Sequence, residues 1–157
     1  LVDLVELNYD FNNFYKWQEH QHSIFSSIGT QLQKLSLVGN TIHTLPHYFS
    51  TFTNLTVLYL HGNKFQLFPD QILQLTNLQE LSIGHKISVI PDQISNLCNL
   101  KMLNIKYNDI YHLPKSMISL RSLQVLFCDG NPLNANTLVL LSTLRSASVR
   151  VYYNDRS

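Results

Sequence analysis

Two cysteines are the residues of this 157-residue chain best suited to nucleophilic chemistry or soft-metal binding. Cys98 and Cys128 lie far apart in the sequence and lack the C-x-x-C spacing of a zinc or redox site. Two cysteines are also too few for a disulfide framework, so we expect a reducing compartment and a cytoplasmic location. Cys128 holds a position that aliphatic residues hold in the repeats described below. A small buried hydrophobic residue is therefore the favoured interpretation, and a nucleophile is the alternative.

Seven histidines could bind a metal, and His20 with His22, or His61 with His85, are the pairs to consider. Neither pair has cysteine or carboxylate partners at ligand spacing. The sequence also contains no G-x-S-x-G, no H-E-x-x-H and no glycine-rich phosphate-binding loop. We therefore expect no catalytic residue, metal or cofactor in this chain. A catalytic domain elsewhere in a longer protein stays open.

Charge is scarce in this sequence. Asp, Glu, Lys and Arg make up 13% of the residues, about half of the roughly 25% usual in soluble domains. The formal net charge of +1 offers no field for nucleic acid or anionic lipid, so neither is an expected partner. No apolar run approaches the roughly 18 residues of a membrane span. The acidic start, Leu-Val-Asp-Leu-Val-Glu, does not resemble a signal peptide, and because it lacks Met we expect a piece of a longer protein.

A repeat of 22 or 23 residues organises the chain. The repeated units open at Leu32, Leu55, Leu78, Leu100 and Leu123. An aliphatic residue stands three residues after the opening leucine in every unit, and four of the five units have another five residues after it, where the last has Cys128. An asparagine stands eight residues after the opening leucine in four units: Asn40, Asn63, Asn108 and Asn131. Further along each of the first four units, an apolar residue is followed directly by a proline. These prolines are Pro46, Pro69, Pro91 and Pro114.

Each unit predicts a strand, a turn and a helical turn. The alternating apolar residues at its start are typical of a strand with one buried face. The proline suits the first position of a helical turn, and apolar residues then recur every third position. One unit cannot bury its apolar side alone, so neighbouring units must stack. We expect an α/β fold with one core.

The pattern resembles the leucine-rich-repeat family, in the 23-residue form L-x-x-L-x-L-x-x-N-x-L-x-x-L-P-x-x-I-x-x-L-x-x that is typical of intracellular proteins. The resemblance covers about residues 32–133. It implies a right-handed curved solenoid, with short parallel strands on the concave face and short helices or turns on the convex face.

The asparagines predict a structural ladder, because an amide at the bend after a strand can bond the backbone groups that the turn leaves unpaired. The third unit has a turn one residue shorter and places His85 where its asparagine should stand. The favoured interpretation is that a ring nitrogen of His85 makes the same backbone bonds. A pH-sensitive kink or a binding feature is the alternative.

Both ends of the repeats look capped, which gives one domain over residues 1–157. An N-terminal cap is expected over residues 1–31, five repeats over residues 32–133 and a C-terminal cap over residues 134–157. Phe14, Trp17, Ile24, Phe25 and Ile28 predict one face of a helix between Asn13 and Ile28. Residues 1–10 are open between strand and helix. Leu138, Leu141 and Leu144 predict a helix over residues 134–145 behind an Asn134 cap, and residues 149–153 predict a last strand.

The resemblance also implies a partner-binding surface, the concave face, formed by the residues two, four and six places after each opening leucine. Its first unit contributes Lys34, Ser36 and Val38. The candidate binding residues are Val57, Tyr59, His61, Glu80, Ser82, Met102, Asn104, Lys106, Tyr107, Val125, Phe127 and Asp129, with Gly84 in the same row. Aromatic and soft apolar groups beside polar ones suit a protein interface. Lys106 and Asp129 fall on adjacent strands and are expected to pair.

These features predict a non-catalytic, monomeric module that binds a protein partner through the concave face. The alternative is a recognition or autoregulatory part of a larger enzyme. A secreted bacterial effector, which would act in the host cytosol, also fits the repeat class and the Asn, Ile, Lys and Tyr content.

Overall fold

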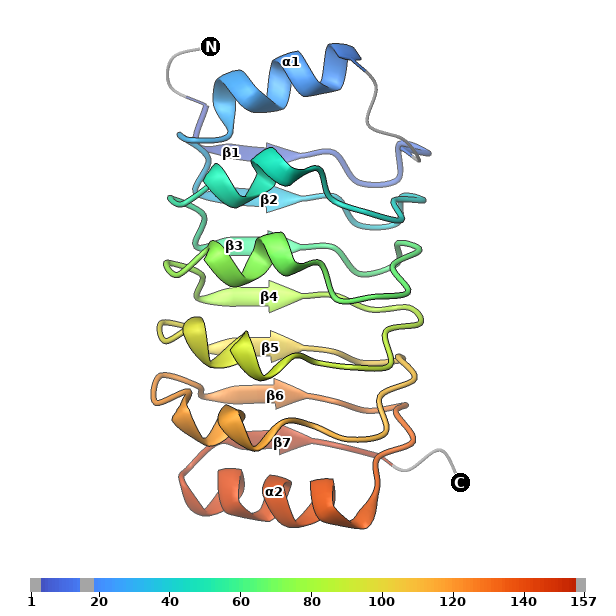
Figure 1. Ribbon diagram of the computed structural model, residues 1–157, viewed down its shortest axis with the longest axis vertical. Helices are drawn as coiled ribbons and strands as arrows, with labels where there is room; N and C mark the ends of the chain where they lie inside the picture. The colour runs from blue at the N-terminus through green and yellow to red at the C-terminus, as the bar shows by residue number, and fades with distance from the viewer. Residues whose placement is uncertain (1–3, 15–18, 155–157) are drawn as a thin grey trace.

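The fold is a stack of parallel strands (Figure 1). A computed structural model describes residues 4–14 and 19–154, without the side chains of residues 19–21. Its seven strands form one parallel sheet in sequence order. They are β1 (Glu6–Asn8), β2 (Lys34–Ser36), β3 (Val57–Tyr59), β4 (Glu80–Ser82), β5 (Met102–Asn104), β6 (Val125–Phe127) and β7 (Arg150–Tyr152).

Each strand is three residues long, and its central side chain faces the core. The central residues are in register from strand to strand: Leu7, Leu35, Leu58, Leu81, Leu103, Leu126 and Val151. The five leucines in the middle of this row are at most 1% exposed. The recurring leucines therefore form a continuous core along the stack.

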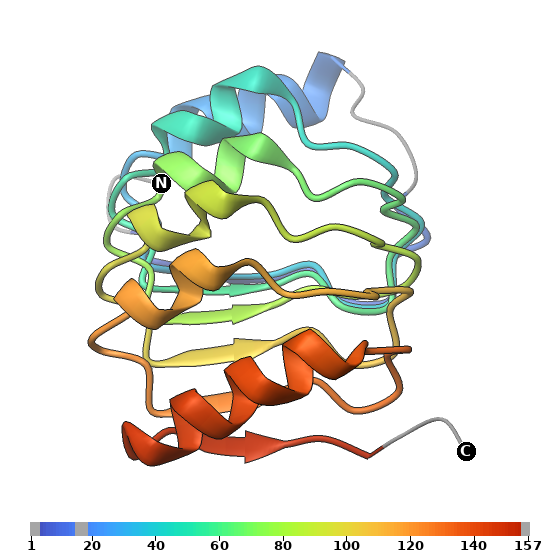
Figure 2. The same ribbon diagram turned by 60° about the horizontal axis from the view of Figure 1, so that its bottom comes forward.

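Short 3-10 helices cover the other side of the core (Figure 2). They are η1 (His47–Thr51), η2 (Asp70–Gln74), η3 (Asp92–Asn96) and η4 (Lys115–Ser119). A proline precedes each of them and keeps an extended conformation, with ψ between 112° and 155°. The helices thus begin one residue after the proline, and the expectation that proline is their first residue is wrong by that one position.

The N-terminal end carries β1 and the helix α1 (Glu19–Ile28). β1 pairs with β2 in parallel, which decides the open question of residues 1–10 for the described residues in favour of a strand. Phe25 and Ile28 are buried, as is Phe14, but Phe14 lies in the loop before the helix and Ile24 is 48% exposed. The expected helix start at Asn13 is wrong, because Asn13 has a φ of 52°. Trp17 lies outside the described residues.

The helix α2 (Ala135–Ser146) lies at the C-terminal end, followed by β7. The side chain of Asn134 caps α2 by accepting from the N–H of Thr137 at 2.9 Å. Leu141 and Leu144 are buried, but Leu138 is 42% exposed. The buried face is formed by Thr137, Leu140, Leu141 and Leu144. This spacing turns Leu138 toward solvent, which corrects its expected place in the core.

Candidate functional site: the concave sheet face

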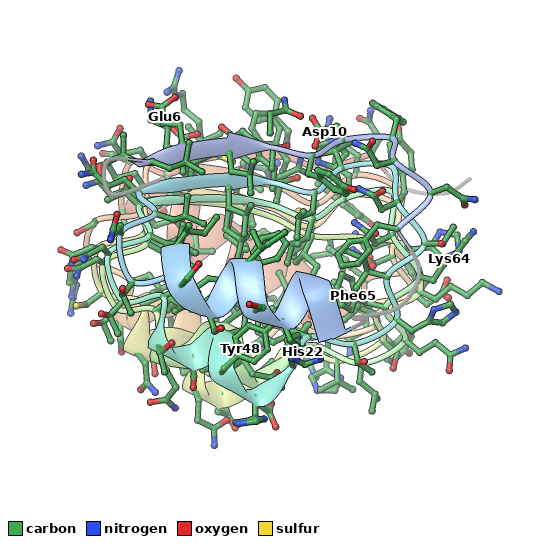
Figure 3. All side chains as sticks on the ribbon, turned by 90° about the horizontal axis from the view of Figure 1, so that it is seen from above. Glu6, Asp10, His22, Tyr48, Lys64 and Phe65 are labelled. Carbon is green, nitrogen blue, oxygen red and sulfur yellow. The ribbon has the colours of Figure 1, made fainter. Side chains whose placement is uncertain are left out.

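The concave face carries three rows of side chains that cross the strands. Strand pairing aligns the first row, which is Glu6, Lys34, Val57, Glu80, Met102, Val125 and Arg150. It also aligns the second, which is Asn8, Ser36, Tyr59, Ser82, Asn104, Phe127 and Tyr152. Two residues further along the chain, the third row is Asp10, Val38, His61, Gly84, Lys106, Asp129 and Asn154. Seen from the N-terminal end, Glu6 and Asp10 lie on the sheet side, whereas His22 and Tyr48 lie on the helix side (Figure 3).

Buried asparagines hold the turns that follow these strands. The Asn63 amide donates to the carbonyls of Leu37 and Leu60, both at 2.8 Å, and its oxygen accepts from the N–H of Ile42 at 3.0 Å. Asn40, Asn108 and Asn131 are also buried and make bonds of the same kind. Each asparagine joins its own turn to the preceding unit, which fixes where each strand ends and where its third-row side chain lies.

His85 does not take the place of the missing asparagine, so that part of the ladder prediction is wrong. Its half-buried ring makes no hydrogen bond within the described residues, and only its backbone N–H is bonded, to Asn108 Oδ1 at 2.8 Å. The shorter turn brings this N–H and that of Ile87 to the same oxygen. Burial lowers the pKa of the ring, Lys64 and Lys86 lower it further, and Asp109 opposes them. The ladder is therefore interrupted at the third unit.

A second set of asparagines, which the sequence analysis did not single out, ties the units together before each strand. The side-chain amide of Asn54 donates to the Thr30 carbonyl at 2.6 Å. Asn77 and Asn99 repeat the bond to the carbonyls of Thr53 and Thr76, at 2.8 and 2.9 Å. Their positions directly before Leu55, Leu78 and Leu100 were a sequence signal for this role.

The first half of the concave face forms an open hollow of about 860 Å³, which is lined by residues of β1 to β4 and of the loops that follow β1, β2 and β3. The Tyr59 hydroxyl donates to the Glu80 carboxylate within it. Burial and then this hydrogen bond raise the pKa of Tyr59 to about 12. Next to them, Ser82 Oγ and His61 Nδ1 lie 2.9 Å apart. Tyr59 and His61 are thus held in place by side chains of the next strand.

The second half of the face contains a packed ion pair and an aromatic stack. Lys106 Nζ lies 2.8 Å from Asp129 Oδ2, which confirms the expected pairing. The same ammonium group lies 5.0 Å from the centre of the Phe127 ring. Phe127 stacks on Tyr152 with ring centroids 4.8 Å apart. Tyr152 was not among the predicted site residues, because β7 lies beyond the last full repeat.

Not every predicted site residue is open to a partner. Ser82 is 3% exposed and Asp129 is 8% exposed, so both act as supports for His61 and Lys106. Gly84 is buried as well. Val57, Tyr59, Glu80, Met102, Asn104, Lys106, Val125 and Phe127 are half-buried, whereas His61 and Tyr107 are exposed. The available surface is therefore mixed aromatic, apolar and polar.

The described part of the chain lacks the features of a metal site and of a membrane-spanning helix. It holds no group of three or more His, Cys, Asp or Glu side chains arranged for a metal ion. The His20 side chain, one half of a candidate pair, lies outside the described residues. Within the same residues there is no helix with the length and hydropathy needed to cross a bilayer.

Cys128 is fully buried, and burial raises the pKa of its thiol to about 12. Because the thiol form then dominates at every pH below that value, we expect iodoacetamide at pH 8 to modify the exposed Cys98 and to spare Cys128. Intact-mass spectrometry of the native protein should show one adduct, and two after unfolding in urea. Rapid double labelling of the native protein would contradict the burial of Cys128.

Similarities to known proteins agree with this architecture. The leucine rich repeat family model matches residues 30–86. The chain is 38% identical over 137 residues to "Probable serine/threonine-protein kinase pats1" of Dictyostelium discoideum, which is 83% of this chain and 4% of that protein.

Two solved structures extend the likeness to nearly the whole chain. A Leptospira interrogans leucine-rich-repeat protein has 31% identity and a TM-score of 0.80, covering 94% of this chain and 36% of that one. The Listeria monocytogenes internalin inlF has 25% identity and a TM-score of 0.79, covering 98% of this chain and 44% of that one. The chain spans less than half the length of each of these proteins. With its repeats, asparagine ladder and parallel sheet, it belongs to the leucine-rich-repeat family.

Proposed function

We propose that this chain binds a protein partner through its concave face, without catalysis, as a monomeric and cytoplasmic module in which residues 1–157 act as one domain. The observation that supports the proposal is the sheet face itself. Aligned rows of side chains cross its seven strands, and a hollow of about 860 Å³ lies over the first four. Leucine-rich-repeat domains are generally protein-interaction modules, which supports this choice. Two free cysteines support the cytoplasmic location.

The composition of the face favours a protein over a small ligand. Tyr59, Phe127 and Tyr152 are aromatic residues, and hydrogen-bonded or ion-paired neighbours fix two of their rings in place. Rigid aromatic side chains surrounded by polar groups are the usual anchors of protein interfaces. The hollow is open along the face, so an extended surface of a partner can contact several strands at once.

We expect the triple replacement of Tyr59, Asn104 and Phe127 by Ala to abolish partner capture. Each side chain is half-buried on the second row, so the change removes contact surface while leaving the leucine core intact. The measurement is affinity capture from a native extract with wild-type and variant chains, followed by mass spectrometry of what only the wild type retains. The far-UV spectrum and the thermal midpoint should change little.

A matched triple variant on the other side of the molecule serves as the control. Val89, Ile118 and Val139 are exposed and line an apolar groove between η3, η4 and α2. Their replacement by Ala should leave capture unchanged. If the concave variant keeps the partner and this control loses it, the binding site lies on the helix side and the proposal is wrong.

A second candidate function is favoured by the match to a much larger kinase. In this alternative the chain is the recognition or autoregulatory part of a larger enzyme, and the secreted bacterial effector is a further variant of it. The coding sequence on either side of this chain distinguishes these cases, because an adjoining catalytic domain supports the alternative. An adjoining secretion signal supports the effector.

A further inference from the structure

The shortened third turn opens a notch in the rim of the concave face. The notch has a volume of about 300 Å³ and is lined by His61, Gly62, Ile83, Gly84, His85, Asn104, Lys106 and Tyr107. Gly84 is required there, because a Cβ at this position would lie 2.7 Å from the Lys106 carbonyl oxygen. The missing residue of the third unit thus produces a defined space beside the hollow, and His61 lines both.

The notch also interrupts a row of backbone hydrogen bonds along the rim. In other units the corresponding N–H donates to the next unit, as from Gly39 to the His61 carbonyl at 3.1 Å and from Tyr107 to the Asp129 carbonyl at 2.9 Å. The N–H of Gly62 makes no such bond within the described residues. A backbone donor is therefore left at the wall of the notch, where an acceptor from outside can reach it.

Two imidazole rings and one ammonium group lie around the notch. The His85 ring has no hydrogen-bond partner within the described residues. Nδ1 of His61 faces Ser82, so Nε2 remains for another contact. Lys106 shares its ammonium group with Asp129, and Lys64 and Lys86 lie close enough to act on His85, as does Asp109. Lys64 and Lys86 each act on the His85 ring more strongly than Asp109 does, which favours an anionic acceptor beside the ring.

Tyr107 forms one wall of the notch and has a strained backbone conformation. Its φ of 54° is left-handed, at a position where the loop after β1 has Phe11, with a φ of 55°, and three other units have Gly39, Gly62 and Gly130, also with positive φ. A left-handed conformation is unfavourable for a bulky residue by about 1–3 kcal/mol. Tyr107 is nevertheless 68% exposed, so core packing does not account for it. Tyr107 therefore presents an exposed aromatic ring beside the notch, as Phe11 does beside the hollow.

We propose that this notch receives an Asp or Glu side chain of the protein that binds the concave face. The inference rests on the proposed function and names the chemistry of the partner at one point. The carboxylate accepts from the Gly62 N–H and from the ring N–H groups or the Lys106 ammonium group, and the Tyr107 ring packs against its stem. The rest of the partner then lies in the neighbouring hollow.

Random peptides displayed on phage and selected on the immobilised wild-type chain test this inference. Selected peptides that the Tyr59, Asn104 and Phe127 triple variant fails to bind should share an Asp or Glu. Replacing that residue by Asn or Gln should weaken binding to the wild-type chain about tenfold, the range of one charge-assisted hydrogen bond. For the His85→Ala chain and for the Lys106→Gln chain, the same peptide replacement should weaken binding less than about threefold. The reason is that the peptide change and the notch variant then remove the same interaction.

Controls and contrary outcomes separate the inference from the proposed function. His112→Ala and Lys101→Gln change exposed residues outside the notch and should keep the full dependence on the carboxylate. The inference is overturned, and the proposed function stays intact, if peptides that fail to bind the triple variant carry no acidic residue. The same holds if such peptides bind both notch variants as tightly as the wild-type chain. Failure to select any peptide that the triple variant loses counts against the proposed function instead.

Discussion

Replacing Asn63 by Ala should lower the free energy of unfolding by about 3 kcal/mol, because a buried amide with three backbone partners is lost. Asn63 is fully buried. The Leu37 carbonyl keeps a bond to Asn40, but the only hydrogen bond that the Ile42 N–H makes within the described residues is to Asn63 Oδ1. A buried donor without an acceptor is the main cost. Urea denaturation measures the loss as a lower midpoint at an unchanged slope.

Asn54→Ala is the matched control for this prediction. Asn54 is exposed and makes one bond, to the Thr30 carbonyl, which water can replace. Its loss should cost no more than about 1 kcal/mol. Equal losses of stability for the two variants would show that the buried asparagine ladder does not hold the turns and does not position the concave rows.

Phe52→Ala is the second large change and should cost about 4 kcal/mol, in the range of buried phenylalanine truncations. Phe52 is fully buried, and its ring lies 4.6 Å from that of Phe49 between centroids. It also packs under the end of α1, where a Cβ on Gly29 would lie 1.9 Å from the ring. The truncation therefore leaves a cavity between the N-terminal helix and the first repeats.

Leu67→Ala tests whether this effect comes from burial. Leu67 is 78% exposed, so its truncation should change the stability by less than about 0.5 kcal/mol. Thermal and urea unfolding of both variants give the comparison. A small loss for Phe52→Ala would mean that the helix α1 is not packed on the repeats as described.

The repeats were predictable because their core residues are set by local spacing. A leucine at the centre of each strand must face inward, and the next unit can only stack in register if its leucine recurs at nearly the same interval. The strand positions around Leu35, Leu58, Leu81, Leu103 and Leu126 follow from this rule. The parallel sheet and the helical side of the fold follow from it as well.

The ends were less predictable because their helices pack on one side only. The few apolar residues of each helix are compatible with more than one rotation of the helix about its axis. In the structure Ile24 and Leu138 are exposed, although the sequence allowed either to be buried. The strand β1 could not be predicted, because α1 lies between it and the first full repeat. The leucines of β1 therefore do not follow the interval of 22 or 23 residues.

The sequence predicts the candidate site as a surface and not as a set of contacts. Spacing places Tyr59 and Phe127 in one row, but only the structure shows that Ser82 and Asp129 are buried supports and that Tyr152 stacks on Phe127. His85 illustrates the same limit. Its position in the pattern favoured a ladder role, but the shorter turn changes the local backbone and leaves its ring outside the ladder.

Photo-crosslinking from single sites shows which face of this chain a captured protein partner contacts. A benzoylphenylalanine residue replaces Asn104 on the concave face in one chain and the exposed Leu67 in another. We predict that the captured partner crosslinks to the chain labelled at position 104 and not to the chain labelled at position 67. Crosslinking from position 67 alone would contradict the proposed concave binding site.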